Sequence, residues 1–185
     1  MIKLFKSLSI LAALALFITA CGAQVAQAQP EDHTAPNTVT YQTVLGKPLN
    51  DKEVTDFIAN YNCSYAGQFR GCNSAGMALW IGSGQTVEAV YLYPNITYDF
   101  GAYKGVLPYG LASNDTMANV EQKFGQRKVE QAPQAGWELG LPDESGTPDH
   151  IHYWAVYKRF GVTIIYNSPS AEDKGATIYA ILVNK

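Results

Sequence analysis

Two pairs of strand-like segments recur in the same order along the chain, and this recurrence limits the fold more than any other feature. Residues 76–81 (GMALWI) parallel 161–166 (GVTIIY), and 84–92 (GQTVEAVYL) parallel 175–183 (GATIYAILV). A segment of helical periodicity precedes each pair, so three elements agree in order. A helix with a short meander cannot bury its sheet face alone, so two such halves are expected to join. The alternative is that the similarity between these segments is a coincidence between hydrophobic strand sequences.

The first helical segment follows Asn50, which has Glu53 three residues later and therefore predicts an N-cap with a capping box. Apolar residues then follow at helical spacing on one face: Val54, Phe57, Ile58 and Tyr61. The second helix begins after Ser113-Asn114, with a face of Met117, Val120 and Phe124. Gly125 is expected to end it as a left-handed C-cap.

The remaining apolar segments predict strands and hairpins. Segments 77–81 and 86–93 flank Gly82-Ser83-Gly84, and segments 151–158 and 162–166 flank Arg159-Phe160-Gly161. Segments 63–69 and 177–183 complete the set. The expected fold is α+β: a tandem helix-plus-antiparallel-meander repeat forming one sheet, with both helices packed on one face and the other face open to solvent or a partner. One domain, 41–185, would contain halves at about 41–95 and 105–185.

The N-terminus has the parts of an export signal. Lys3 and Lys6 precede an apolar stretch, 8–18, that is short for a membrane span. Ile-Thr-Ala before Cys21 resembles a bacterial lipobox, in which the cysteine is lipidated. The resemblance implies a signal peptide at 1–20, a palmitate-bearing Cys21 and, from Gly22, anchoring to the outer membrane facing the periplasm. An uncleaved anchor helix or cleavage after 26–28 (AQA) are the alternatives.

Composition restricts the partners of the mature chain. Residues 21–40 are rich in Ala, Gln, Pro and Thr and read as a flexible tether with a reach of roughly 25 Å. Loss of residues 1–20 would leave 11 basic and 16 acidic side chains, a net charge of −5. No basic stripe is present, so nucleic acid is excluded as a partner.

Lipidation of Cys21 would leave two cysteines, Cys63 and Cys72. In an oxidising compartment such a pair is expected to form a disulfide. A redox or metal pair is the alternative, but the spacing is not C-x-x-C.

Two resemblances extend these observations. The run 103–111 (YKGVLPYGL), followed by a helix ending in Phe124-Gly125, resembles a group of uncharacterised bacterial proteins without an established activity. Some members of that group look like immunity or accessory proteins. The helix-then-meander unit, used twice, is similar in architecture to beta-lactamase-inhibitor proteins and to the SmpA/OmlA outer-membrane lipoproteins. This second resemblance implies protein binding and transfers no functional residue.

Candidate chemistry is sparse. His150 and His152 are weak candidates to bind Zn²⁺, with Asp143, Glu144 or Asp149 as a third ligand, but an exposed strand end beside a polar loop is the favoured interpretation and no metal site is predicted. The sequence has no Gly-x-Ser-x-Gly elbow and no phosphate-binding loop. We therefore expect no catalytic residues, no cofactor and no enzymatic activity.

Aromatic residues crowd the stretch between the halves and continue into the second half. We expect a partner surface that includes Tyr98, Phe100, Tyr103, Tyr109 and Trp137. The alternative is that some of these aromatic side chains pack in the core instead of forming a partner surface. The predicted function is a lipid-anchored periplasmic protein that binds a protein partner stoichiometrically, as inhibitor or immunity proteins do. An envelope-assembly lipoprotein of the SmpA/OmlA kind is the alternative.

Overall fold

The computed structural model describes residues 40–125, 128–136, 139, 141 and 150–185. Residues 37–185 belong to one unit. The predicted signal peptide and the predicted tether up to residue 39 lie outside the described residues. Among the residues that are described, no helix has the length and apolar character needed to cross a membrane.

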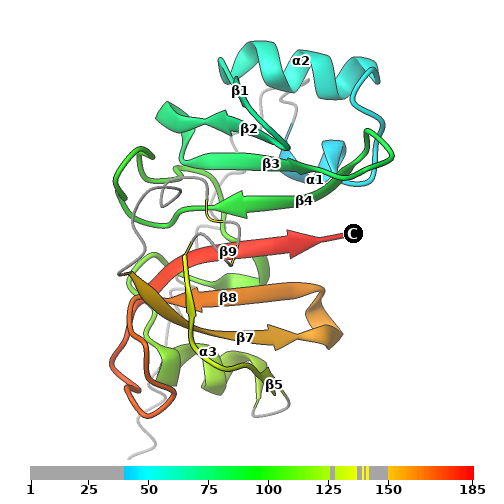
Figure 1. The fold of residues 1–185 in the computed structure, drawn as a ribbon. Coiled ribbons are helices and arrows are strands. Elements are labelled where there is room, and N and C mark those ends of the chain that lie inside the picture. Colours follow the sequence, from blue (N-terminus) through cyan, green and yellow to red (C-terminus); the bar gives the residue numbers. More distant parts are fainter. Residues whose placement is uncertain (1–39, 126–127, 137–138, 140, 142–149) are drawn as a thin grey trace, which may run out of the picture. The chain divides into compact units, whose positions relative to one another are not determined.

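An antiparallel sheet forms the centre of the fold (Figure 1). Its strands are β1 (Ser64–Ala66), β2 (Phe69–Cys72), β3 (Met77–Ile81), β4 (Val87–Leu92), β5 (Val129–Glu130), β6 (Gln134–Ala135), β7 (Ile151–Tyr157), β8 (Val162–Tyr166) and β9 (Ile178–Asn184). They are arranged in the order β1-β2-β3-β4-β9-β8-β7-β5, and β6 also pairs with β7. The first and last parts of the domain therefore meet where β4 pairs with β9, with Val90 opposite Val183.

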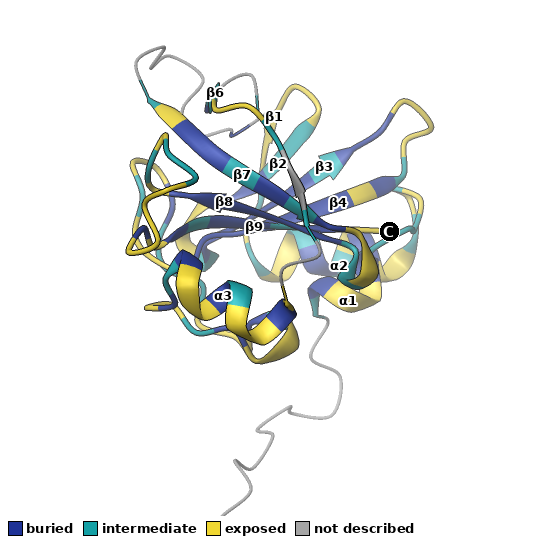
Figure 2. Cartoon of the chain, turned by 90° about the horizontal axis from the view of Figure 1, so that it is seen from below, coloured by how far each residue is buried: buried dark blue, intermediate teal, exposed yellow. Residues whose placement is uncertain are grey.

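The helices lie on one side of this sheet, with β6 on the other (Figure 2). They are α1 (Tyr41–Val44), α2 (Lys52–Asn60) and α3 (Met117–Phe124). Both predicted helix faces are confirmed, because their apolar residues enter one core with β3, β4, β8 and β9. Val54, Phe57, Met117, Val120 and Phe124 are all buried there. The α+β class and the placement of both helices on one face are thus confirmed.

The helix ends differ in part from the prediction. Asp51, not Asn50, caps α2, and its carboxylate accepts a hydrogen bond of 2.8 Å from the Glu53 amide. The Glu53 carboxylate pairs with Lys47 at 2.7 Å. The predicted capping box is therefore wrong at α2. Gly125 ends α3 with a positive φ of 77°, but its ψ of 173° sends the chain onward in an extended direction rather than through a left-handed turn.

The predicted strand 63–69 is wrong, because this segment is part of a hairpin. β1 and β2 pair across a turn at Gly67, which has a φ of 59°. The predicted disulfide is confirmed: Cys63 and Cys72 join the two open ends of the hairpin. Closing so short a loop restricts the unfolded chain and is worth about 2–3 kcal/mol.

The two halves share one local structural feature, a short helix and a left-handed glycine before a strand. A one-turn 3-10 helix, η1 (Asn73–Ala75) or η4 (Lys158–Phe160), precedes β3 or β8. Gly76 (φ 66°, ψ 38°) and Gly161 (φ 63°, ψ 30°) then turn the chain in the left-handed conformation that glycine tolerates best. These are the glycines that open the first pair of matching segments in the sequence. The duplication itself stays a prediction.

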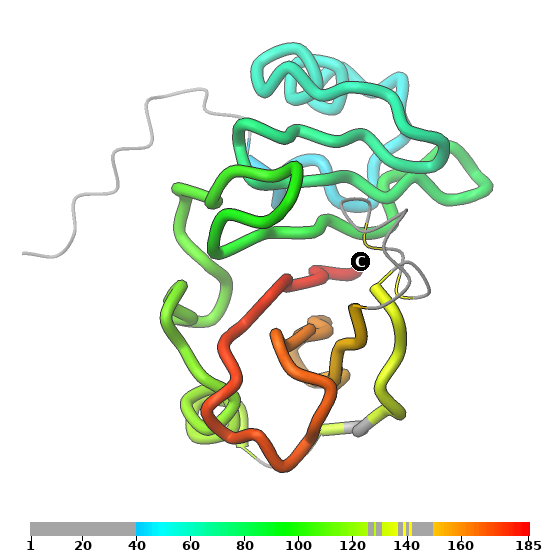
Figure 3. Tube along the Cα trace, turned by 60° about the vertical axis from the view of Figure 1, so that its left-hand side comes forward, coloured from blue at the N-terminus to red at the C-terminus, as the bar shows by residue number. Residues whose placement is uncertain are grey.

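The face of the sheet opposite the helices is aromatic and partly covered. Phe100 stacks on Tyr93 with ring centroids 4.5 Å apart, and Leu141 is buried in the same cluster. The expectation of an open face is therefore wrong in part, since these side chains shield its centre from water. The chain reaches the second half through residues 93–116, which we call the connector and which run along one side of the domain (Figure 3).

Candidate functional site

The connector exposes large apolar side chains to solvent. Ile96 is 80% exposed, Tyr98 58%, Val106 84% and Tyr109 53%. Burying such side chains is favourable by about 25 cal/mol for each square ångström of apolar surface. Where such side chains lie next to one another on the surface, they mark an interaction site.

Backbone hydrogen bonds hold the first part of the connector in place. The Thr97 amide donates to the Phe100 carbonyl oxygen at 2.9 Å and closes a turn. The Gly101 amide donates to Asn73 at 2.8 Å, and the Tyr103 amide donates to Tyr93 at 2.7 Å. Ile96 and Tyr98 are therefore presented by an anchored loop, which lowers the entropy lost when a partner binds.

Ile96 and Tyr98 border a groove of about 690 Å³. Its lining comes from the connector, the start of β7, the segment after β8 and the start of β9: Ile96, Thr97, Tyr98, His150, Ile151, His152, Asn167, Ser168, Pro169 and Tyr179. We call this the connector groove. Its described lining residues include no Asp, Glu, Lys or Arg, so the groove suits an apolar or neutral polar segment.

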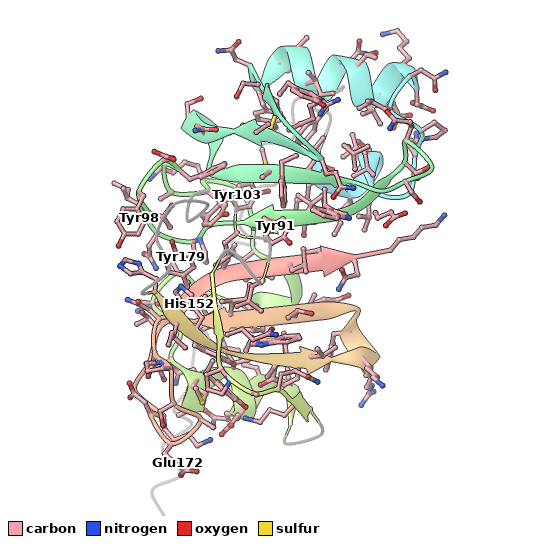
Figure 4. All side chains as sticks on the ribbon, in the orientation of Figure 1. Tyr91, Tyr98, Tyr103, His152, Glu172 and Tyr179 are labelled. Atoms are coloured by element: carbon pink, nitrogen blue, oxygen red, sulfur yellow. A yellow bond between two sulfur atoms is a disulfide. The ribbon has the colours of Figure 1, made fainter. Side chains whose placement is uncertain are left out.

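The two histidines have different environments. His152 is buried, and its Nδ1 donates to the Tyr166 carbonyl oxygen at 2.9 Å, because a carbonyl can only accept. The Tyr98 hydroxyl lies 2.8 Å from a ring nitrogen of His150. Figure 4 shows Tyr98, His152 and Tyr179 gathered at the same end of the strands. Tyr98 and His150 thus contact each other within the lining of the groove.

The weak zinc candidates His150 and His152 gain no third ligand from the described residues. Within them, no group of three or more His, Cys, Asp or Glu side chains is placed to hold an ion. The predicted third ligands Asp143, Glu144 and Asp149 lie outside the described residues.

Comparison with known proteins finds no relative. No family model, no curated protein and no solved structure matches the chain. The groove is therefore interpreted from its own residues and their contacts.

Of the predicted partner-binding residues, Tyr98 lies in the connector groove. Phe100 is only 3% exposed and packs on Tyr93, so its placement on a partner surface is wrong. Tyr103 is half-buried against Tyr41 on the helix side, where burial raises its pKa to about 12. Trp137 lies outside the described residues.

Tyr109 is exposed but does not line the groove. Its hydroxyl donates to the Phe160 carbonyl oxygen at 2.6 Å, and its ring packs edge-on against Phe124. Leu107 and Leu111, on either side, are buried in the helix-side core. In this chain, the run 103–111 thus braces the connector against the helix-side core.

The sequence did not indicate Ile96, Ile151 or Tyr179 as groove residues. Ile151 is 48% exposed at the first position of β7, and Tyr179 comes from the far end of the chain. The alternation of side chains between the two faces of a strand could have assigned Ile151 in β7 and Tyr179 in β9 to a face of the sheet. Ile151 and Tyr179 lie beside the connector only because β7, β8 and β9 are neighbours in the sheet. No local sequence pattern predicts that strand order.

Proposed function

We propose that this chain is a lipid-anchored periplasmic lipoprotein that binds a protein partner stoichiometrically, in the manner of an inhibitor or immunity protein. The observation that carries the proposal is the connector groove, where Ile96, Tyr98 and Ile151 are exposed around one hollow whose described lining has no Asp, Glu, Lys or Arg. A partner that buried these three side chains would gain several kcal/mol of apolar transfer energy. Tyrosine in such a position is a frequent binding hot spot.

The architecture supports the same proposal. We propose that β2-η1-β3-β4 and β7-η4-β8-β9 are duplicated units, joined where β4 pairs with β9. Left-handed Gly76 and Gly161 at matching positions favour this interpretation. A duplicated helix-and-meander domain is similar to beta-lactamase-inhibitor proteins and to SmpA/OmlA lipoproteins, both of which act by binding.

Replacing Tyr98 or Ile96 with aspartate is expected to weaken partner binding at least tenfold without unfolding the domain. A buried carboxylate would face the apolar surface of the partner and lose its hydration. The loss is measured with the full-length protein carrying a photo-crosslinking residue at position 151 in the native host. One crosslinked species is expected, and its yield should fall in both variants.

A crosslinker at position 55 is the matched control, because Thr55 is exposed on α2 and α2 lies on the other side of the sheet. Equal labelling from positions 55 and 151 would contradict the proposed surface. The identity of the crosslinked protein separates the two functional classes. An exported toxin or enzyme supports inhibition, whereas a component of envelope assembly supports the alternative.

Replacing Cys21 with serine is expected to abolish membrane anchoring. Serine has no thiol for the thioether to diacylglycerol, and stable anchoring needs at least two membrane signals. Labelling with radioactive palmitate and fractionation of the envelope would measure the effect. Label on the serine variant, or membrane association that survives the substitution, would contradict the lipid anchor.

A further inference from the structure

A second groove lies on the sheet face opposite the helices, near the end of β9. It encloses about 510 Å³ and is lined by Trp80, Glu88, Ala89, Tyr91, Leu139, Leu182, Asn184 and Lys185. We call it the sheet-face groove. It is separate from the connector groove and shares no lining residue with it. Tyr98 and Tyr179 of the connector groove lie toward the opposite end of the strands from the end of β9 (Figure 4).

Aromatic side chains form the wall of this groove. Phe69 packs edge-on against Trp80, with ring centroids 4.8 Å apart, and against Tyr91 at 5.7 Å. The Tyr91 hydroxyl donates to the Leu139 carbonyl oxygen at 3.3 Å. Ala89 pairs with Trp80 across the two strands and contributes only a methyl group to the lining of the groove. Trp80 is thus packed against its neighbours, half-buried, and part of the groove lining.

A β-bulge next to this wall carries Glu88, which also lines the groove. Trp80 pairs with Ala89 and Ile81 pairs with Val87, so Glu88 has no partner of its own on β3. Bulges of this kind redirect a side chain out of the normal alternation. The carboxylate occupies the space beside Gly82, where a Cβ atom would overlap it. The absence of a side chain at Gly82 therefore makes room for the carboxylate.

The charge of Glu88 is not neutralised within the described part of the chain. No ion pair or side-chain hydrogen bond joins Glu88 to any described residue. Lys185 lines the same groove, but its methylene stem packs over Gly46. An anionic group beside an aromatic surface is the complement of a planar cation.

We propose that the sheet-face groove binds an arginine side chain of the protein partner. The guanidinium would stack on the Trp80 indole and donate two parallel hydrogen bonds to the Glu88 carboxylate. Lysine fits less well, because its ammonium is compact, strongly hydrated and unable to form the bidentate pair. The inference rests on the proposed binding function and adds the chemistry of one contact.

The test uses the full-length Cys21→Ser protein with N-acetyl-arginine amide as the probe. N-acetyl-citrulline amide, which has the same shape without the charge, is the matched probe. Nuclear magnetic resonance follows the Trp80 indole N–H, assigned with Trp80→Phe. Arginine amide is expected to shift this signal saturably, with at least fivefold higher affinity than citrulline amide.

Glu88→Gln should remove that preference and Glu172→Gln should keep it, because Glu172 is an exposed carboxylate away from the groove (Figure 4). Equal affinity for both probes, or a preference that survives Glu88→Gln, would overturn the inference. Saturable binding of a chitin oligosaccharide in place of arginine amide would also overturn it and would assign the groove to a glycan. None of these results depends on crosslinking at position 151, so the proposed function stands or fails separately.

Discussion

Replacing Gly76 with alanine is expected to destabilise the domain by roughly 3 kcal/mol. Gly76 has a φ of 66°, and a left-handed conformation costs an alanine about 1–2 kcal/mol. A Cβ atom there would also overlap the Gly101 carbonyl oxygen and the Tyr103 amide nitrogen, both backbone atoms of the connector. Relieving such an overlap costs about 1–3 kcal/mol more. Urea unfolding at neutral pH measures the difference.

Gly161→Ala is the matched control for this prediction. Gly161 has almost the same φ, 63°, but the nearest atom to its Cβ position is the Asn184 carbonyl oxygen at 3.6 Å, an ordinary contact. Only the conformational cost applies there, so about 1 kcal/mol is expected. Equal losses in the two variants would show that the connector does not pack against Gly76 in solution.

The Gly76 variant should also weaken binding at the connector groove. Displaced residues 101–103 would lose the hydrogen bonds that anchor the loop carrying Ile96 and Tyr98. Crosslinking from position 151 should therefore fall in Gly76→Ala and stay unchanged in Gly161→Ala. The contrast between the two glycines thus links the stability of the fold to the function proposed for it.

Features encoded by neighbouring residues could be predicted from the sequence. The faces of α2 and α3 follow from apolar spacing within a few turns, and the β3–β4 hairpin follows from two apolar runs around a short polar turn. The N-cap of α2 was missed by one residue because Asn50 and Asp51 are both good caps. The hairpin of β1 and β2 was missed because Ser64–Ala66 is short, fully exposed and without apolar alternation.

The site depended on contacts that no local pattern encodes. Ile96 and Phe100 lie four residues apart in a loop, yet one is 80% exposed and the other 3%. No helical or strand periodicity in the sequence distinguishes these two residues. Phe100 is buried by its contact with Tyr93, which is a tertiary contact. Similarly, Glu88 lines the sheet-face groove at a bulge in β4, and a bulge breaks the alternation that a sequence pattern would follow. The aromatic stretch is visible in the sequence, but which of its members reach the surface depends on tertiary contacts.

Alkaline solution is expected to unfold the domain cooperatively between about pH 11 and pH 12. Burial is the largest cause that raises the pKa of five tyrosines: the half-buried Tyr103 and four others, Tyr41, Tyr91, Tyr157 and Tyr166. All four are almost fully buried, and the pKa of Tyr91 reaches about 12. In the unfolded chain a tyrosine ionises near pH 10, at about its ordinary pKa.

Whether high pH stabilises or destabilises the domain follows from the number of protons that each state binds. Below about pH 10 these tyrosines are neutral in both states, so the stability is unaffected. Above that pH the unfolded state loses protons that the folded state keeps, and each group lowers the free energy of unfolding by up to about 1.4 kcal/mol per pH unit. Four groups acting together would cancel a typical stability of about 5–15 kcal/mol within one to two pH units.

Tyrosinate absorbance and near-ultraviolet circular dichroism, recorded on the same samples, check the prediction. A substantial part of the absorbance is expected to rise in the same step in which the circular dichroism is lost. Tyr166→Phe should move that step to higher pH, because it removes one buried hydroxyl. Tyr65→Phe should not, since the Tyr65 ring is 73% exposed. Gradual ionisation of all tyrosines with unchanged circular dichroism would mean that the buried rings open to water without unfolding.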